Sequence, residues 1–277
     1  MPELPEVELV AQSLNKLVSS RKIIIAELLR ERLAPYNPPE EFAERLKDST
    51  INFVHRRGKH ILFNLDSGST LITHLRMSGR FLLLPVEREL PKFSHAVFYF
   101  EDETRLVFSD QRHFGMMKIV ETTNLHEAPE IKKLAPEPFS NEFNLEYFRA
   151  VLKTSKRNLK EFLLDQTKVL GLGNIYVSES LFLARIHPQI SADKVSKQKA
   201  AILFEKIREV LHESIALGST LNVNPENIDG SYYGGGYENR WRVYDRENQT
   251  CVNCETPVAR LKQGGRSSYF CPKCQRK

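Results

Sequence analysis

Three residues at the start of the chain, Pro2, Glu3 and Glu6, place an amine and two carboxylates within a few positions of one another. We expect Met1 to be removed, because the residue after it is small, and Pro2 then carries a secondary amine. With an ordinary α-amino pKa near ~8, part of this amine is unprotonated at neutral pH and can attack an electrophilic sugar carbon to give an iminium. One carboxylate could protonate a ribose ring oxygen while the other holds the terminus in position. On these residues alone the alternative stays open that proline and acids only start a helix.

All four cysteines lie near the other end of the chain, in two Cys-x2-Cys pairs separated by sixteen residues: Cys251, Cys254, Cys271 and Cys274. Two thiolate pairs on two tight turns can complete a tetrahedral Zn²⁺ shell at ~2.3 Å per bond, which leaves no open position for catalysis. We therefore expect one structural zinc ion. Because no cysteine precedes these four, a disulfide framework spread through the fold is excluded.

The segment between the two cysteine pairs is basic, with Arg260, Lys262 and Arg266 placed around Gly264 and Gly265. A β-hairpin that offers an arginine beside a glycine turn can reach a phosphate without steric hindrance. A solvated basic hairpin without a ligand remains the alternative. The net charge of +5 is concentrated in this part of the chain, since residues 239–277 alone carry a formal +6. Four zinc-bound thiolates would offset part of that excess.

The composition is that of a globular protein, with 41% hydrophobic and 27% charged residues. The first residues are acidic and lack the basic and apolar regions of a signal peptide, and no run approaches the ~18 apolar residues that a membrane span needs. We expect an intracellular, cytoplasmic protein without a membrane partner.

The elements that must position these groups change in character along the chain. After Pro5 an apolar stripe that includes Val7, Val10 and Leu14 predicts a helix. From Lys22 to about Val120 short strands with turn residues between them predict an antiparallel sandwich or barrel. The predicted strands are Ile23–Ile25, Ile51–His55, His60–Leu65, Leu71–Leu75, Phe81–Leu84, Ala96–Phe100 and Arg105–Phe108.

Two closely spaced prolines, Pro136 and Pro138, then predict a linker, and helical periodicity follows it. The predicted helices are Leu145–Leu152, Leu159–Leu164, Tyr176–Leu183 and Lys197–Leu217. The segment 218–238 holds five of the thirteen glycines and no clear element, which predicts a long loop. Such a loop is often functional, and plain surface disorder is the alternative.

Six motifs in order along the chain resemble the formamidopyrimidine-DNA glycosylase (MutM) family. They are Pro2-Glu3-Leu4-Pro5-Glu6-Val7-Glu8, Arg56-Arg57-Gly58-Lys59, His74-Leu75-Arg76-Met77-Ser78-Gly79, Arg112-His113-Phe114-Gly115, Gly171-Leu172-Gly173-Asn174-Ile175-Tyr176, and the four-cysteine finger with Arg266. Together they span about 270 residues, which makes chance agreement a poor explanation.

The resemblance implies an α+β fold of two domains, with DNA held in the cleft between them. A first helix and an antiparallel β-sandwich (1–133) would be joined by a hinge (134–140) to a helix-two-turn-helix domain (141–238, with a lesion-capping loop at 218–238). A four-cysteine zinc-finger β-hairpin (239–277) would follow.

The family's catalytic roles carry over to matching positions of this sequence. The resemblance implies that Pro2 is the nucleophile and Schiff-base former and that Glu3 assists ribose opening. Glu6 belongs to the same catalytic motif. Lys59 would act on the phosphate and sugar during β-elimination, and Arg266 would contact phosphate and assist δ-elimination.

The resemblance also implies a set of DNA contacts. A base that leaves the stack must be replaced, and Met77 and Phe114 would be the apolar wedge that fills the space, with core packing as the alternative for both. Arg112 would hydrogen-bond the orphaned cytosine. Phosphate contacts around the lesion would come from His74, Asn174 and Arg266. Further expected DNA contacts are His95, Lys156 and Lys160.

This resemblance implies a bifunctional base-excision-repair enzyme that removes oxidised purines from duplex DNA and nicks the strand by β,δ-elimination. We expect a monomer without a nucleotide cofactor or catalytic metal. The start of the loop, Gly218-Ser219-Thr220-Leu221-Asn222, departs from the family's usual Gly-Gly-Ser-Ser type, which puts the preferred lesion in doubt. Two alternatives therefore stay open: an endonuclease-VIII-like glycosylase for oxidised pyrimidines, and a catalytically inactive zinc-dependent protein that binds damaged DNA.

Overall fold

The computed structural model describes residues 1–220, 237 and 240–277. The chain divides between Lys132 and Lys133 into two compact units. The predicted loop 218–238 lies outside the described residues except for Gly218, Ser219, Thr220 and Tyr237.

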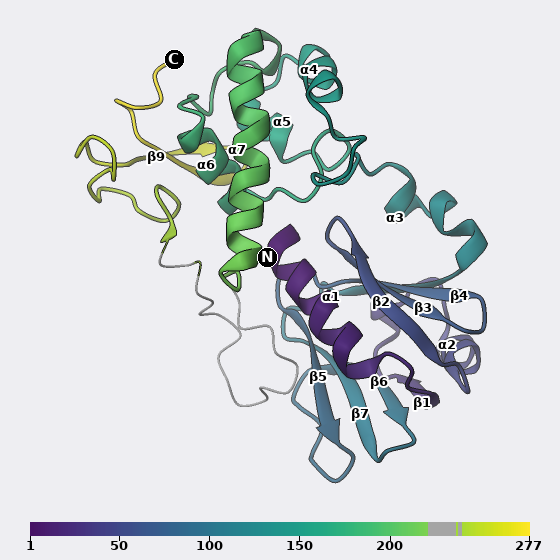
Figure 1. Cartoon of the computed structure of the whole chain (residues 1–277). Coiled ribbons are helices and arrows are strands. Elements are labelled where there is room, and N and C mark those ends of the chain that lie inside the picture. Colours follow the sequence, from purple (N-terminus) through teal and green to yellow (C-terminus); the bar gives the residue numbers. More distant parts are fainter. Residues whose placement is uncertain (221–236, 238–239) are drawn as a thin grey trace. The chain divides into compact units, whose positions relative to one another are not determined.

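The first unit contains two four-stranded antiparallel sheets (Figure 1). One has the order β1-β6-β7-β5, from Ile23–Leu28, Ser94–Phe100, Thr104–Asp110 and Gly79–Pro85. The other has the order β2-β3-β4-β8, from Ile51–Arg57, His60–Leu65, Ser69–His74 and Met116–Glu121. Large side chains from both sheets belong to one buried core, and the rings of Phe63 on β3 and Phe81 on β5 meet edge to face at 5.4 Å. The predicted antiparallel sandwich is therefore confirmed.

Helix α1 (Leu4–Val18) closes one side of this core. Its apolar stripe, which includes Val7, Val10 and Leu14, is buried in the same cluster as the two sheets. Helix α2 (Pro39–Leu46) packs against β1 through Phe42 and Leu46. The outer face of β3 and β4 is covered by η2 (Thr122–Glu127) and α3 (Pro129–Lys132). Every predicted strand was found, whereas α2, α3 and β8 were missed.

The second unit is helical, with α4 (Leu145–Lys153), α5 (Leu159–Leu163), α6 (Asn174–Leu183) and α7 (Lys197–Ala216). All four were predicted, with ends that agree within about two residues. Short 3₁₀ turns lie at Glu31–Leu33 in the first unit and at Ala192–Lys194 in the second. The hairpin β9 (Ala259–Gln263) and β10 (Arg266–Phe270) follows the helices and packs against α6.

No helix in the described part of the chain is both long and apolar enough to cross a membrane.

Candidate functional site

The amino terminus leads directly into helix α1, and its two acids are buried. The backbone N–H of Glu3 donates to Oε2 of Glu6 at 2.8 Å, within a reciprocal capping box at the start of the helix. Glu3 is only 3% exposed and Glu6 only 1%. Glu6 thus holds the backbone next to Pro2, and both carboxyl groups stand at the positive end of the helix.

The turn that carries Lys59 joins two strands beside this helix. Asn15 Oδ1 accepts from Val54 N at 2.7 Å, and one end of β2 is tied to the first half of α1 by the Arg56–Glu8 ion pair at 2.5 Å. As β2 runs from Val54 to Arg56, its contact with α1 moves from Asn15 to Glu8, which lies nearer the start of the helix. Lys59 follows three residues after Arg56. Gly58 adopts a left-handed φ of 58° in this turn, which suits glycine. Lys59 is buried, so its ammonium group is positioned by the protein.

His74 lies at the end of β4, paired in register with His60 on β3. The two rings meet edge to face at 4.8 Å, and Nδ1 of His74 accepts from the backbone N–H of Arg76 at 3.0 Å. A neutral imidazole whose Nδ1 accepts carries its proton on Nε2. Burial, with the nearby charges of His60, Arg76 and Lys59, holds the pKa of His74 well below its ordinary value. His74 is therefore a neutral donor through Nε2–H, as a phosphate contact requires.

The two predicted wedge residues and Arg112, the predicted partner of the orphaned cytosine, lie in two loops at one end of the sandwich. Met77, between β4 and β5, is half-buried, while Arg112 and Phe114, between β7 and β8, are exposed. Phe114 is 49% exposed, which excludes core packing as the explanation for this side chain. The guanidinium of Arg112 lies over the Phe114 ring at 5.4 Å.

A buried carboxylate that the sequence analysis missed, Asp110, joins these two loops. Its Oδ1 accepts from the hydroxyl of Ser78 and from the N–H of Arg112 at 3.1 Å, and its Oδ2 accepts from the N–H groups of Phe114 and Gly115 at 2.7 and 2.6 Å. Burial raises the pKa of Asp110, but the hydrogen bonds from Ser78 and the three amides outweigh it and lower the pKa below its ordinary value. An aspartate two residues before Arg112 was the available signal, since such a residue often bonds to the backbone that follows it.

His95 is buried in β6 and bonded to His113, a residue of the same loop as Arg112. His95 Nε2 and His113 Nδ1 lie 3.0 Å apart, and the rings are stacked. Burial, and then the neighbouring His113, lowers the pKa of His95, while Asp110 opposes this shift. A direct DNA contact by His95 stays a prediction, and His113 is the more exposed member of the pair.

In the second unit, Asn174 is the first residue of α6, directly after Gly173. The backbone amides of a helix's first turn have no partner within the helix and favour anions. The Oδ1 atom of Asn174 is buried and has no hydrogen-bond partner among the described residues. The start of α6 agrees with the phosphate contact that the resemblance implies, in which the NH₂ group of Asn174, not its Oδ1, would donate.

Arg266 is exposed at the tip of the β9–β10 hairpin. It pairs in register with Gln263 across a two-residue turn of Gly264 and Gly265, whose φ angles of 50° and 77° are those of a type I′ turn. Arg260, farther along the hairpin, forms an ion pair with Glu247, with 3.1 Å between a guanidinium nitrogen and Oε2.

Lys156 and Lys160 have opposite surroundings. Lys156 is exposed, as a DNA contact requires, but Lys160 is 0% exposed. The Lys160 ammonium donates to the carbonyl of Ser267 at 2.5 Å and the hydroxyl of Ser268 at 2.7 Å. The expectation that Lys160 contacts DNA directly does not fit this burial, and we assign it to holding the hairpin instead.

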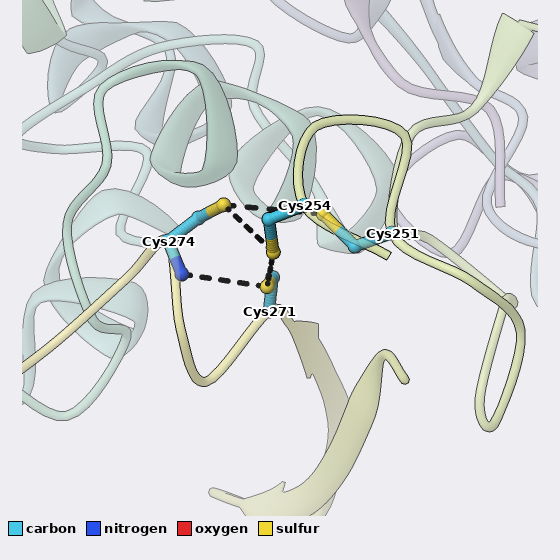
Figure 2. Close-up of side chains that lie close together, drawn as sticks. All are labelled: Cys251, Cys254, Cys271 and Cys274. Carbon is cyan, nitrogen blue, oxygen red and sulfur yellow. Dashed lines mark hydrogen bonds between the residues drawn. The ribbon is translucent and has the colours of Figure 1, made fainter. Parts of the chain in front are cut away.

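The four cysteines converge on one point, as Figure 2 shows. All their sulfur atoms lie within 4.8 Å of one another, and the Sγ atoms of Cys251–Cys274, Cys254–Cys271 and Cys254–Cys274 are 4.0, 3.4 and 3.4 Å apart. A tetrahedron with Zn–S bonds of ~2.3 Å has S–S edges of about 3.8 Å. None of the cysteines forms a disulfide. The donor set fits one structural zinc ion, as predicted.

Comparisons with known proteins match the whole length of the chain. Residues 1–117 match the model of the formamidopyrimidine-DNA glycosylase N-terminal domain, residues 134–224 the H2TH domain of the same enzymes, and residues 248–276 a zinc finger found in FPG and IleRS. The formamidopyrimidine-DNA glycosylase of Listeria innocua is 38% identical over 276 residues, with 100% of both chains covered.

Two solved structures of the Lactococcus lactis Fpg protein are similar over their whole length. One is a complex with FAPY-dG containing DNA, with a TM-score of 0.92, 33% identity, and 99% of this chain and 100% of that chain covered. The other is a complex with DNA that contains an oxidised pyrimidine, with a TM-score of 0.92, 34% identity and 100% of both chains covered.

Proposed function

Because this chain belongs to the formamidopyrimidine-DNA glycosylase family, we propose that it removes oxidised purines from duplex DNA and then cuts the strand at the abasic site. It is a DNA repair glycosylase of this family with a structural zinc finger. The preferred lesion, the lyase steps and the residue roles below are our proposal.

The observation that carries this proposal is the amino terminus. Pro2 stands immediately before a helix whose capping box buries Glu3 and Glu6. Once Met1 is removed, the Pro2 nitrogen is a secondary amine beside a buried carboxyl group. The bond from Glu3 N–H to Glu6 holds the backbone next to that amine.

The chemistry follows from these groups. The Pro2 nitrogen attacks C1′ of the damaged nucleotide, and the electron pair of the glycosidic bond leaves with the base, which takes up a proton. Glu3 protonates the ribose ring oxygen, the C1′–O4′ bond breaks, and loss of the nitrogen proton gives an iminium at C1′. Removal of a C2′ proton then expels the 3′-phosphate, and a second elimination expels the 5′-phosphate. We assign Lys59 to the first of these steps and Arg266 to the second.

We propose that Met77 and Phe114 enter the space of the extruded base and that Arg112 hydrogen-bonds the cytosine left behind. Phosphates flanking the lesion would be held by His74, Asn174 and Arg266, with further contacts from Lys156 and His95. The partner is damaged double-stranded DNA, and the protein acts as a monomer in the cytoplasm, associated with the nucleoid. Residues 134–140 serve as a hinge, and residues 218–238 cover the extruded base.

Excision of oxidised pyrimidines is a second candidate activity. It is favoured by the complex of the Lactococcus lactis relative with DNA that contains an oxidised pyrimidine. Parallel single-turnover assays on duplexes with 8-oxoguanine, formamidopyrimidine or thymine glycol separate the two. We expect the purine lesions to be released faster, and faster release of thymine glycol would reverse the assignment.

Borohydride reduction tests the nucleophile. The native protein incubated with a duplex containing 8-oxoguanine should give a covalent protein–DNA band, because borohydride reduces an iminium to a stable amine. A chain with one residue added before Pro2 should give none. Equal trapping by both proteins would eliminate Pro2, and a native protein that releases base without any trapped band would exclude the iminium route.

A further inference from the structure

The two loops that carry Met77, Arg112 and Phe114 are joined through a single buried carboxylate. Asp110 is 0% exposed, and its carboxylate accepts hydrogen bonds from both loops. Ser78, the residue after Met77, donates its hydroxyl to Asp110 Oδ1 and accepts from the N–H of Arg112 at 3.0 Å. The Ser78 hydroxyl is thus a bridge from one loop to the other.

Both loops are also pressed against one aromatic ring. A Cβ atom built on Gly79 would lie 2.7 Å from Cζ of Phe108, and one built on Gly115 would lie 2.7 Å from both Cε1 and Cζ of the same ring. Phe108 is fully buried in the core between the sheets. Only glycine therefore allows the end of the first loop and the end of the second to approach this ring.

Each loop contains a non-glycine residue in the left-handed region, Arg76 with a φ of 54° and His113 with a φ of 59°. Such a conformation costs energy and persists where surrounding bonds hold it. Arg76 N–H is bonded to His74, and His113 N–H donates to the Asp110 carbonyl at 3.2 Å. The conformation of each loop thus depends on a bond to the strand end that precedes it.

We propose that Asp110 and Ser78 are positioning residues that hold the two loops in a fixed arrangement, so that Met77, Arg112 and Phe114 enter the duplex together. The inference rests on the proposed function, because it assumes that Met77 and Phe114 fill the space of an extruded base and that Arg112 hydrogen-bonds the base left opposite it. Independent loops would have to find the inserted arrangement separately and lose conformational entropy on binding. The hydrogen bonds of Asp110 and Ser78 fix the relative position of the two loops before DNA binds.

Asp110 contributes more than one bond, because a carboxylate accepts at both oxygens. An asparagine of the same shape offers one accepting oxygen, so its amide group would face either the Arg112 amide or those of Phe114 and Gly115. Ser78→Ala is the milder change, because it removes only the bridge and leaves the Asp110 turn in place.

The test uses binding to a duplex with a tetrahydrofuran abasic-site analogue opposite 2-aminopurine. This probe contains no base to excise, so its result is independent of the lesion preference and of the chemistry at Pro2. We expect Ser78→Ala to weaken binding by about tenfold and to reduce the rise in 2-aminopurine fluorescence, with Asp110→Asn weaker still. The matched control is Ser109→Ala, which removes a buried serine hydroxyl bonded to the Lys92 carbonyl but joins no loops. It should change binding by less than about twofold.

A second arm separates positioning from general stability. In a chain that already carries Met77→Ala, Arg112→Ala and Phe114→Ala, Ser78→Ala should no longer alter the affinity, because none of the three side chains is left to position. The same loss in both backgrounds would overturn the proposal, and so would native-like binding by Ser78→Ala or an equal loss from Ser109→Ala. Failure of the native protein to release 8-oxoguanine, with the Ser78 effect intact, would instead count against the proposed function alone.

Discussion

The ammonium group of Lys160 donates to the hydroxyl of Ser268 at 2.7 Å, which ties helix α5 to strand β10. The same ammonium group also donates to the carbonyl of Ser267, the residue that follows Arg266. The side chain of Glu161 lies close to Gly264 in the turn of the same hairpin. The exposed guanidinium of Arg266 therefore stands on a hairpin that Lys160 holds and that Glu161 approaches at its turn.

Lys160→Met should destabilise the second unit. The side chain keeps its length, but the Ser267 carbonyl and Ser268 hydroxyl lose their donor, which costs about 2 kcal/mol in the free energy of unfolding. Thermal or denaturant unfolding without DNA measures this loss. Lys156→Met is the control, because Lys156 is exposed and its removal should leave the unfolding free energy unchanged. Equal stability of the two variants would contradict a structural role for Lys160.

The sequence was sufficient where local pattern and chemistry coincide. The two Cys-x2-Cys pairs predicted the zinc site because ligand type and spacing define a tetrahedral shell almost without tertiary information. Helix α1 was predictable from Pro5 and the apolar stripe that follows it. The strands were predictable because they are short runs separated by turn residues. Strand β8 escaped because Met116-Met117-Lys118 has little of the β-branched character that the other strands have.

What the sequence could not give is the surroundings of individual polar side chains. Lys160 and Lys156 are both lysines in a basic stretch, and only packing against β10 makes one of them buried. Asp110 is similar, since its hydrogen bond to Ser78 crosses 32 residues of sequence. Helix α2 escaped for a different reason, because it is eight residues long and only Phe42 and Leu46 are buried. The surroundings of Lys160 and Asp110 depend on partners that are far away in the sequence, which a local pattern does not encode.

Arg266→Gln should weaken DNA binding and reduce its salt dependence. Loss of one phosphate contact lowers the slope of log K against log[salt] by about one. Titrations of a tetrahydrofuran duplex at several salt concentrations measure this slope. Arg260→Gln removes the same charge from the same hairpin, but Arg260 is paired with Glu247, so we expect an unchanged slope. If both variants lost the same slope, the contact would be a general charge effect.

Zinc removal should release the hairpin. The cysteines pack in one cluster with Phe182, Val258 and Tyr269, so loss of the metal loosens these contacts as well as the turns. Trp241, the only tryptophan of the chain, lies 4.9 Å from Tyr244, whose ring in turn meets Tyr269. Chelation should change its emission and weaken DNA binding by about tenfold or more, because Arg266 is no longer positioned. Zn²⁺ should restore both signals and Mg²⁺ neither, while full binding after verified zinc loss would contradict the role.

The pair of His60 and His74 should make the first unit sensitive to acid. The pKa of His60 is lowered from its ordinary value of 6.5 to about 4, chiefly by burial; the backbone of Arg57 and Glu130 oppose this shift, and the charges of Arg76 and Arg57 add to it. The unfolded chain takes up this proton below about pH 6.5, whereas the folded protein does so only near pH 4. Stability due to this group is therefore fully present above pH 6.5 and falls as the pH drops from 6.5 toward 4.

For His60 alone, the free energy of unfolding should be about 2.5 kcal/mol lower at pH 4.5 than at pH 7. The measurement is denaturant unfolding at both pH values for the native protein and for His60→Phe, which keeps a ring edge to face with His74. This variant should lose most of that difference, because phenylalanine binds no proton in either state. His126→Gln, which removes an exposed histidine, should retain it. A His60→Phe protein with the native pH dependence would show that His60 is not the group that titrates.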